Sequence, residues 1–170
     1  MTLLIVLSLF LQNARPEVRV PDLEKLLHQS VNVERQGNGQ ERLEWDDALG
    51  NLARAHSEDM AKRGYFKHEN PEGLTPMKRL LAAGYDKCRL VGENIHQNNL
   101  YSRAITERKR TTYEWNTMEQ IAASTMREWV GSAGHRQNIL EKNFTREGIG
   151  VAIAGDDKVY VTQILCAETN

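Results

Sequence analysis

The stretch GIGVAIAGDDKVYVTQILC (148–166) decides the fold class. Two strand-like runs flank GDD (155–157), and a cluster of turn residues between two such runs predicts an antiparallel hairpin. Before the hairpin, most apolar residues recur at helical spacing. Helices that come first and a hairpin that comes last predict an α+β fold, in which helices pack on a small antiparallel sheet.

Toward the N-terminus from the hairpin, the sequence predicts five helices and one further strand. The clearest helix begins after Asp46, a good N-cap, and ends at Gly64. Another follows Asn116 and Glu119, which resemble a capping box. The other helices are expected at about residues 22–35, 76–83 and 135–140, and the strand at 90–97. Residues 98–115 are polar and give no clear assignment.

Length and composition indicate one globular domain. The chain has 170 residues, of which 40% are apolar and 26% are charged, and its formal net charge is −1. A nucleic-acid-binding protein would need a concentrated basic face, so we expect no nucleic-acid partner. The one basic run is RAITERKR (103–110). It has two interpretations: a solvated helix face or loop, or a contact for anionic lipid or polysaccharide.

The segment TLLIVLSLFL (2–11) is too short to span a bilayer but suits the apolar region of an export signal. It lacks a preceding basic residue and a following cleavage site, so we interpret it as the remnant of a longer signal or anchor. A buried strand is the alternative. The expected organisation is therefore a leader and linker at residues 1–20 and one domain at residues 21–170. Membrane contact is expected only through the leader.

Three polar residues stand out because each lies beside a glycine or a turn: His68, Glu93 and His135. Two imidazoles and one carboxylate could hold zinc or another divalent ion, or they could form an acid–base set. His68 and Glu69 begin a zinc-peptidase HExxH motif, but the second histidine is missing because Glu72 occupies its place. No nucleophile motif is present, which disfavours covalent catalysis.

Several motifs together resemble the CAP superfamily, also called the SCP domain, which includes cysteine-rich secretory proteins, antigen 5 and plant pathogenesis-related 1 proteins. The resemblance spans about residues 22–166 and is of the prokaryotic type. It implies an α-β-α sandwich. The matching motifs are AHSEDMAKRGYFKHENPEG (55–73), GENI (92–95), WVGSAGHRQNIL (129–140), GIGV (148–151) and YVTQ (160–163).

The resemblance also implies a cleft, which in this family usually carries two histidines and two acidic residues. By motif, His68 and His135 match the histidines and Glu93 matches one acid. The other acid falls at Ser132, a replacement that prokaryotic members often carry. The cleft residues implied here are therefore His68, Glu93, Ser132 and His135, with His68 and His135 as metal ligands and Glu93 as the candidate catalytic residue.

The two cysteines, Cys88 and Cys166, allow one disulfide. If the chain is exported, we expect them to pair, because oxidising compartments preserve disulfides. Two unrelated reduced thiols in a cytosolic protein are the alternative.

The sequence supports a cleft better than it supports a reaction. The leading hypothesis is an extracellular or cell-surface binding module, not an enzyme, that holds zinc or another divalent ion and a lipid, peptide or cell-wall ligand. The alternative is a metal-dependent, peptidase-like hydrolase in which His68 and His135 hold the ion and Glu93 is the base. A surface interaction domain with a relic cleft is the third possibility.

Overall fold

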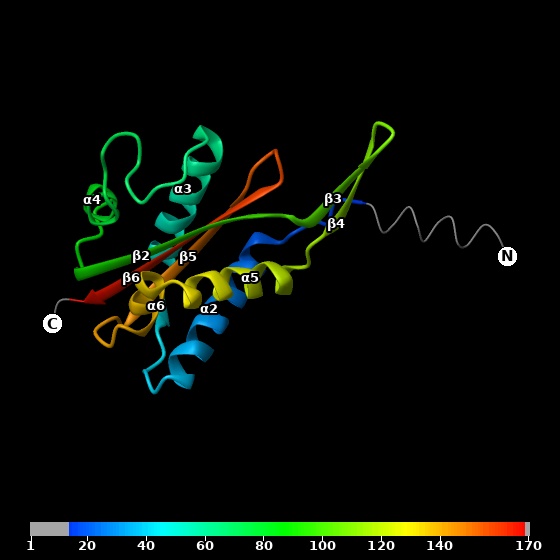
Figure 1. Cartoon of the computed structure of the whole chain (residues 1–170). Coiled ribbons are helices and arrows are strands. Elements are labelled where there is room, and N and C mark those ends of the chain that lie inside the picture. Colours follow the sequence, from blue (N-terminus) through cyan, green and yellow to red (C-terminus); the bar gives the residue numbers. More distant parts are fainter. Residues whose placement is uncertain (1–13, 169–170) are drawn as a thin grey trace.

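The structure, a computed structural model, describes residues 14–168 (Figure 1). The predicted leader at residues 2–11 lies outside the described residues. The helices are α2 (Val20–Gly37), α3 (Asp47–Arg63), α4 (Pro76–Ala82), α5 (Met118–Gly131) and α6 (Ala133–Leu140). The strands are β1 (Glu44–Trp45), β2 (Cys88–Asn99), β3 (Tyr101–Glu107), β4 (Arg110–Trp115), β5 (Arg146–Ile153) and β6 (Lys158–Glu168). Within residues 14–168, no helix is long and apolar enough to cross a bilayer.

The main sheet has four strands in the order β1-β5-β6-β2. β5 and β6 pair antiparallel, so the predicted hairpin at 148–166 is confirmed. β2 pairs antiparallel with the other side of β6 and forms one edge of the sheet. The short β1 adds a parallel pair to β5 at the opposite edge.

Helices cover both faces of this sheet, as Figure 1 shows: α3 and α4 lie on one side, and α2, α5 and α6 lie on the other. Each side has its own apolar cluster. Leu49, Leu80 and Ile164 are among the buried residues on the first side, and Leu27, Trp129 and Val161 are among those on the second. The predicted α+β class and the α-β-α sandwich are therefore confirmed.

Two glycines let α3 lie directly on the sheet. A Cβ atom at Gly148 would come within 2.0 Å of the backbone nitrogen of Gly50, and one at Gly150 would come within 1.8 Å of that of Arg54. Any side chain at either position would push the helix off β5. The GIG sequence thus fixes the distance between this helix and the sheet.

The predicted disulfide is present. Cys88 and Cys166 are bonded across β2 and β6, with their Cα atoms 5.4 Å apart. The two cysteines are separated by 78 residues in sequence, and closing a loop of that length stabilises a fold by about 4 kcal/mol in the chain-entropy model. The bond ties the beginning of β2, the strand that carries Glu93, to the centre of the sheet.

Two sequence interpretations are corrected. The segment 98–115 contains a second hairpin, β3–β4, so the basic run 103–110 is neither a helix face nor an ordinary loop. The hairpin stands away from the layers in Figure 1. The capping box of α5 is made by Thr117 and Gln120 rather than by Asn116 and Glu119. The Thr117 side chain accepts from the Gln120 amide, and the Gln120 side chain accepts from the Thr117 amide.

Candidate functional site

The centre of the site is a hydrogen bond between His68 and Glu93. His68 lies in the loop after α3, and Glu93 lies on the edge strand β2. The imidazole Nδ1 is 2.9 Å from the carboxylate Oε1. The His68 side chain is 50% exposed, whereas the Glu93 side chain is only 2% exposed. A buried carboxylate thus holds one nitrogen of an accessible imidazole.

Arg79 is a site residue that the sequence interpretation missed. It lies on α4, and its guanidinium contacts both members of the pair: Nη1 donates to the His68 carbonyl at 2.5 Å, and Nη2 donates to Glu93 Oε2. Both oxygens of Glu93 are therefore engaged, one by His68 and the other by Arg79. A permanent cation also compensates the cost of burying the carboxylate. The only sequence signal was the start of a helix at Thr75-Pro76, a few residues after His68.

The asparagine of the GEN motif positions the helix that carries His135. Asn94 Nδ2 donates to the His135 carbonyl at 3.1 Å, and Asn138 Nδ2 donates back to Asn94 Oδ1 at 2.8 Å. A Cβ atom at Gly92 would come within 2.8 Å of the Phe144 ring, so a side chain before Glu93 would require that ring to move. These contacts fix α6, and with it His135, against β2.

His135 is half-buried, and its buried Nδ1 has no hydrogen-bond partner among residues 14–168. Burial lowers its pKa, and the nearby charge of His68 lowers it further. Both effects favour the neutral form of the His135 imidazole. A neutral imidazole with an unused nitrogen is chemically suited to bind a metal ion.

Ser132 lies where the acid usually found in this family would be. It lies between α5 and α6 as the C-cap of the first and the N-cap of the second, but its side chain makes no capping hydrogen bond to α6. It is half-buried. The cleft therefore has one acid, Glu93, at the positions that the family motif defines.

The donor set fits a two-histidine ion site in part. Each oxygen of the nearly buried Glu93 carboxylate accepts from one side chain, His68 or Arg79. A carboxylate that accepts from one nitrogen of a histidine leaves the other nitrogen as the ligand, which is the usual arrangement behind metal-binding histidines. Among the described residues, no cluster of three or more His, Cys, Asp or Glu side chains has the geometry of a metal site. His68 and His135 are thus the available protein ligands, and the remaining positions would be open.

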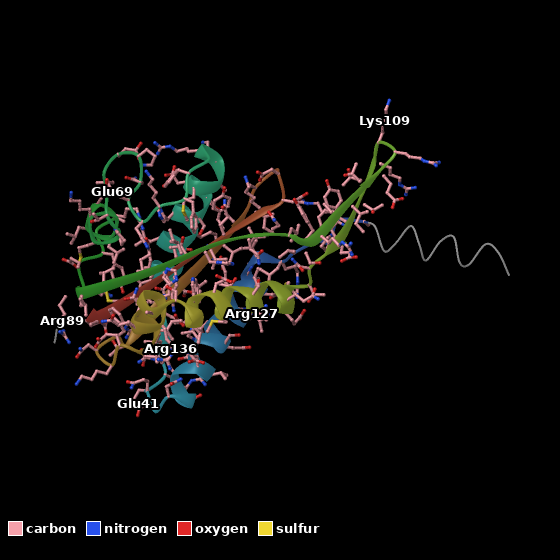
Figure 2. The ribbon with its side chains drawn as sticks, in the orientation of Figure 1. Glu41, Glu69, Arg89, Lys109, Arg127 and Arg136 are labelled. Atoms are coloured by element: carbon pink, nitrogen blue, oxygen red, sulfur yellow. A yellow bond between two sulfur atoms is a disulfide. The ribbon has the colours of Figure 1, made fainter. Side chains whose placement is uncertain are left out.

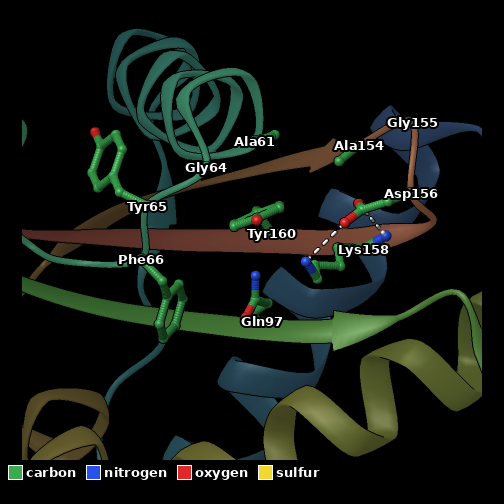
Figure 3. Close-up of a pocket in the computed structure, with 10 residues that line it drawn as sticks. All are labelled: Ala61, Gly64, Tyr65, Phe66, Gln97, Ala154, Gly155, Asp156, Lys158 and Tyr160. Atoms are coloured by element: carbon green, nitrogen blue, oxygen red, sulfur yellow. Dashed lines mark hydrogen bonds and ion pairs between the residues drawn. The ribbon is translucent and has the colours of Figure 1, made fainter.

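A hollow of about 480 Å³ is lined by residues from the end of α3, from β2 and from the β5–β6 hairpin (Figure 3). Gln97 lies four residues after Glu93 on the same strand, so both side chains point to the same face. The Phe66 and Tyr160 rings line the hollow, with centroids 6.5 Å apart. An ion pair between Lys158 and Asp156 lies at its other end. The hollow therefore offers aromatic faces on the side of β2 to which Glu93 points.

The comparisons with known proteins agree with this geometry. Residues 28–165 match the sequence model described as CAP, the Cysteine-rich secretory protein family. The chain belongs to the CAP family. The predicted prokaryotic type is also confirmed, because the relatives of this CAP domain include bacterial proteins and bacterial structures.

Two curated relatives come from Bacillus subtilis (strain 168). The uncharacterized protein YkwD is 32% identical over 132 residues, which cover 78% of this chain and 43% of the relative. The uncharacterized membrane protein YlbC is 31% identical over 140 residues, which cover 82% of this chain and 33% of the relative. The chain thus spans less than half the length of either relative.

Solved structures share the fold. An extracellular protein containing an SCP domain from Bacillus anthracis str. Ames aligns with a TM-score of 0.67 at 24% identity, covering 91% of this chain and 45% of that one. An outer surface protein from Borrelia burgdorferi aligns with a TM-score of 0.70 at 14% identity, covering 92% of this chain and all of that one. At these identities the likeness establishes the fold alone.

Proposed function

We propose that this CAP domain is an extracellular binding module. Its cleft holds a divalent ion, zinc or a similar metal, between His68 and His135, and takes a lipid, peptide or cell-wall ligand beside it. The observation that carries the proposal is the occupation of both Glu93 oxygens, by His68 at 2.9 Å and by Arg79. This arrangement orients an imidazole for binding.

The same contacts disfavour the hydrolase. A general base must reach the water or group from which it takes a proton. The Glu93 side chain is only 2% exposed, so a water could reach its carboxylate only if Arg79 or His68 moved aside. Such a movement would leave a nearly buried cation or an unoriented imidazole. The Arg79 side chain is only 11% exposed. We therefore favour a binder that uses Glu93 to position His68.

The hollow supports a ligand larger than an ion. Phe66 is 41% exposed although it is apolar, and Tyr160 beside it is nearly buried. Aromatic faces next to polar groups suit ligands that are partly apolar, such as acyl chains, sugar rings or peptide side chains. An extracellular place for the domain is supported by its disulfide and by the extracellular and surface proteins that share its fold.

The proposal is tested by measuring the melting temperature and the turnover of the same samples with and without zinc. Zinc should raise the melting temperature, because an ion that binds only the folded state stabilises it. The rise should vanish in His135→Ala and persist in Glu69→Gln, a matched change at an exposed acid beside the site. A library of peptides and esters should show no turnover. Zinc-dependent turnover that disappears in both His135→Ala and Glu93→Ala would instead establish the hydrolase.

A further inference from the structure

The hairpin β3–β4 is an arm that the cleft does not use. Its two strands pair only with each other and form a separate sheet within the described part of the chain. Figure 2 shows Lys109 at the outer end of this arm, away from the helical layers. Near its base, the Tyr113 and Trp115 rings stack with centroids 4.9 Å apart, and Tyr101 packs against both. The aromatic cluster stiffens the arm where it leaves the domain.

The arm is cationic, whereas the chain as a whole is not. Residues 101–115 carry four basic and two acidic side chains, and the formal net charge of the whole chain is −1. All four basic residues are exposed, and none has an ion-pair partner among residues 14–168. They are Arg103, Arg108, Lys109 and Arg110. The positive charge of the tip is therefore available to an external anion.

The turn at the tip is unfavourable for the residues that form it. Arg108 and Lys109 have φ angles of 44° and 72°, in the left-handed region that favours glycine and asparagine. A two-residue hairpin turn of this kind is normally Asn-Gly or Asp-Gly. Arg108 and Lys109 occupy these positions at a cost in stability. Backbone strain that is kept at an exposed turn indicates a function for the residues of that turn.

The described chain begins beside the base of the arm. The Arg15 guanidinium is 2.6 Å from Asp157 Oδ1, and the Leu100 amide donates to the Asp157 carbonyl at 2.7 Å. Asp157, in the β5–β6 turn, thus contacts both Arg15 and Leu100, the residue just before β3. The apolar sequence 2–11 joins the domain only a few residues before Arg15.

We propose that the β3–β4 arm docks the domain on an anionic bilayer, with the guanidinium and ammonium groups of its tip contacting lipid phosphates. Basic groups near an apolar anchor add electrostatic attraction that a single weak anchor needs for stable attachment. Arg15, which contacts the turn at the base of the arm, follows the apolar sequence 2–11 by only four residues, and an apolar sequence so near a basic arm favours a bilayer over a soluble polyanion. Figure 2 shows Glu69, the neighbour of His68, at the end of the molecule opposite Lys109. A docked arm would therefore turn the loop of the cleft away from the membrane.

The test is co-sedimentation of the full chain with two kinds of vesicle, neutral phosphatidylcholine and a mixture with phosphatidylglycerol. The arm variant carries Arg108→Gln, Lys109→Gln and Arg110→Gln. The control variant carries Lys25→Gln, Lys78→Gln and Lys142→Gln, which remove the same charge from exposed positions elsewhere. We expect the partition coefficient of the arm variant on the anionic vesicles to fall by roughly tenfold or more. Its partition coefficient on the neutral vesicles should not change. The control should bind both as the wild type does.

A second variant tests the link between strain and binding. Arg108→Asn with Lys109→Gly supplies the residues that the turn favours, so it should raise the melting temperature while it weakens binding to anionic vesicles. Unchanged binding of the triple arm variant would overturn the proposal. So would arm-dependent binding to soluble polyphosphate without binding to anionic vesicles, since the partner would then be a polymer and not a bilayer.

Discussion

Two histidine–glutamate pairs lie on opposite sides of the same sheet, and their surroundings differ. In the cleft, His68 Nδ1 is 2.9 Å from Glu93 Oε1; on the other side, His28 Nδ1 is 2.6 Å from Glu147 Oε1. Both carboxylates are buried. The His68 side chain is 50% exposed, whereas that of His28 is 18% exposed. The His68–Glu93 pair is thus open to solvent, and the His28–Glu147 pair is enclosed.

The partners of the two pairs explain the difference. Glu93 takes its second donor from Arg79, a permanent cation, so the pair can stay intact when a ligand approaches the free side of His68. Glu147 takes its second donor from the buried amide of Gln163, at 2.6 Å. His28 also packs its ring edge-on against Trp45, with centroids 5.5 Å apart. We interpret the first pair as a binding device and the second as part of the core.

A chain of hydrogen bonds runs from the enclosed pair along one face of the sheet to the helix that carries His135. Glu147 accepts from Gln163, Gln163 accepts from Asn94 at 2.8 Å, and Asn94 donates to the His135 carbonyl. Glu147, Gln163 and Asn94 are fully buried. A satisfied buried network of this kind rigidifies a core. The enclosed pair therefore supports the position of His135 through side chains on the face of the sheet that α2 and α6 cover.

The largest effect is expected when each histidine is removed in turn. His28→Ala should lower the free energy of unfolding by about 2–3 kcal/mol, because it leaves an oxygen of the buried Glu147 without its donor. His68→Ala should cost less than about 1 kcal/mol, because the side chain is half exposed and Glu93 keeps Arg79. Urea unfolding of both variants measures the difference. If both variants lost the same free energy of unfolding, the distinction between a structural His28–Glu147 pair and a functional His68–Glu93 pair would be wrong.

A smaller effect is expected from pH. Burial lowers the pKa of His56, His96 and His135 below the ordinary value of 6.5. The unfolded chain then binds more protons than the folded one once the pH falls below about 6.5, so the free energy of unfolding should decline from there as acidity rises. In metal-free buffer, His135→Gln should show a shallower decline than the wild type between pH of about 7 and about 5.5. An identical decline would mean that His135 is not held in its neutral form by burial.

The sequence could predict one pair and not the other. His68 and Glu93 fall in motifs that resemble the CAP superfamily, and the glycines beside them mark turns and close contacts. His28 gave no signal, because its partner Glu147 lies 119 residues away and only the pairing of β5 with β6 brings Gln163 against it. Arg79 was missed for a related reason: one arginine on a short helix looks like any exposed cation until the helix is packed against β2.

The arm was missed because its strands are polar. Helices and buried strands can be predicted from the periodicity of their apolar residues. β3 and β4 lack this periodicity, because they are mostly exposed and carry charges and threonines on both faces. Their register depends on cross-strand contacts such as the one between Thr106 and Thr111, whose hydroxyls are 2.9 Å apart. Such contacts are visible only once the two strands are paired.

Calorimetric titration with zinc tests the central claim most directly, namely that the open pair is the binding device and the enclosed pair is not. The wild type should bind one ion, His68→Ala should lose that binding, and His28→Ala, measured at a temperature where it is folded, should retain it. The account would be contradicted if the wild type bound no zinc, or if His68→Ala bound zinc as tightly as the wild type does.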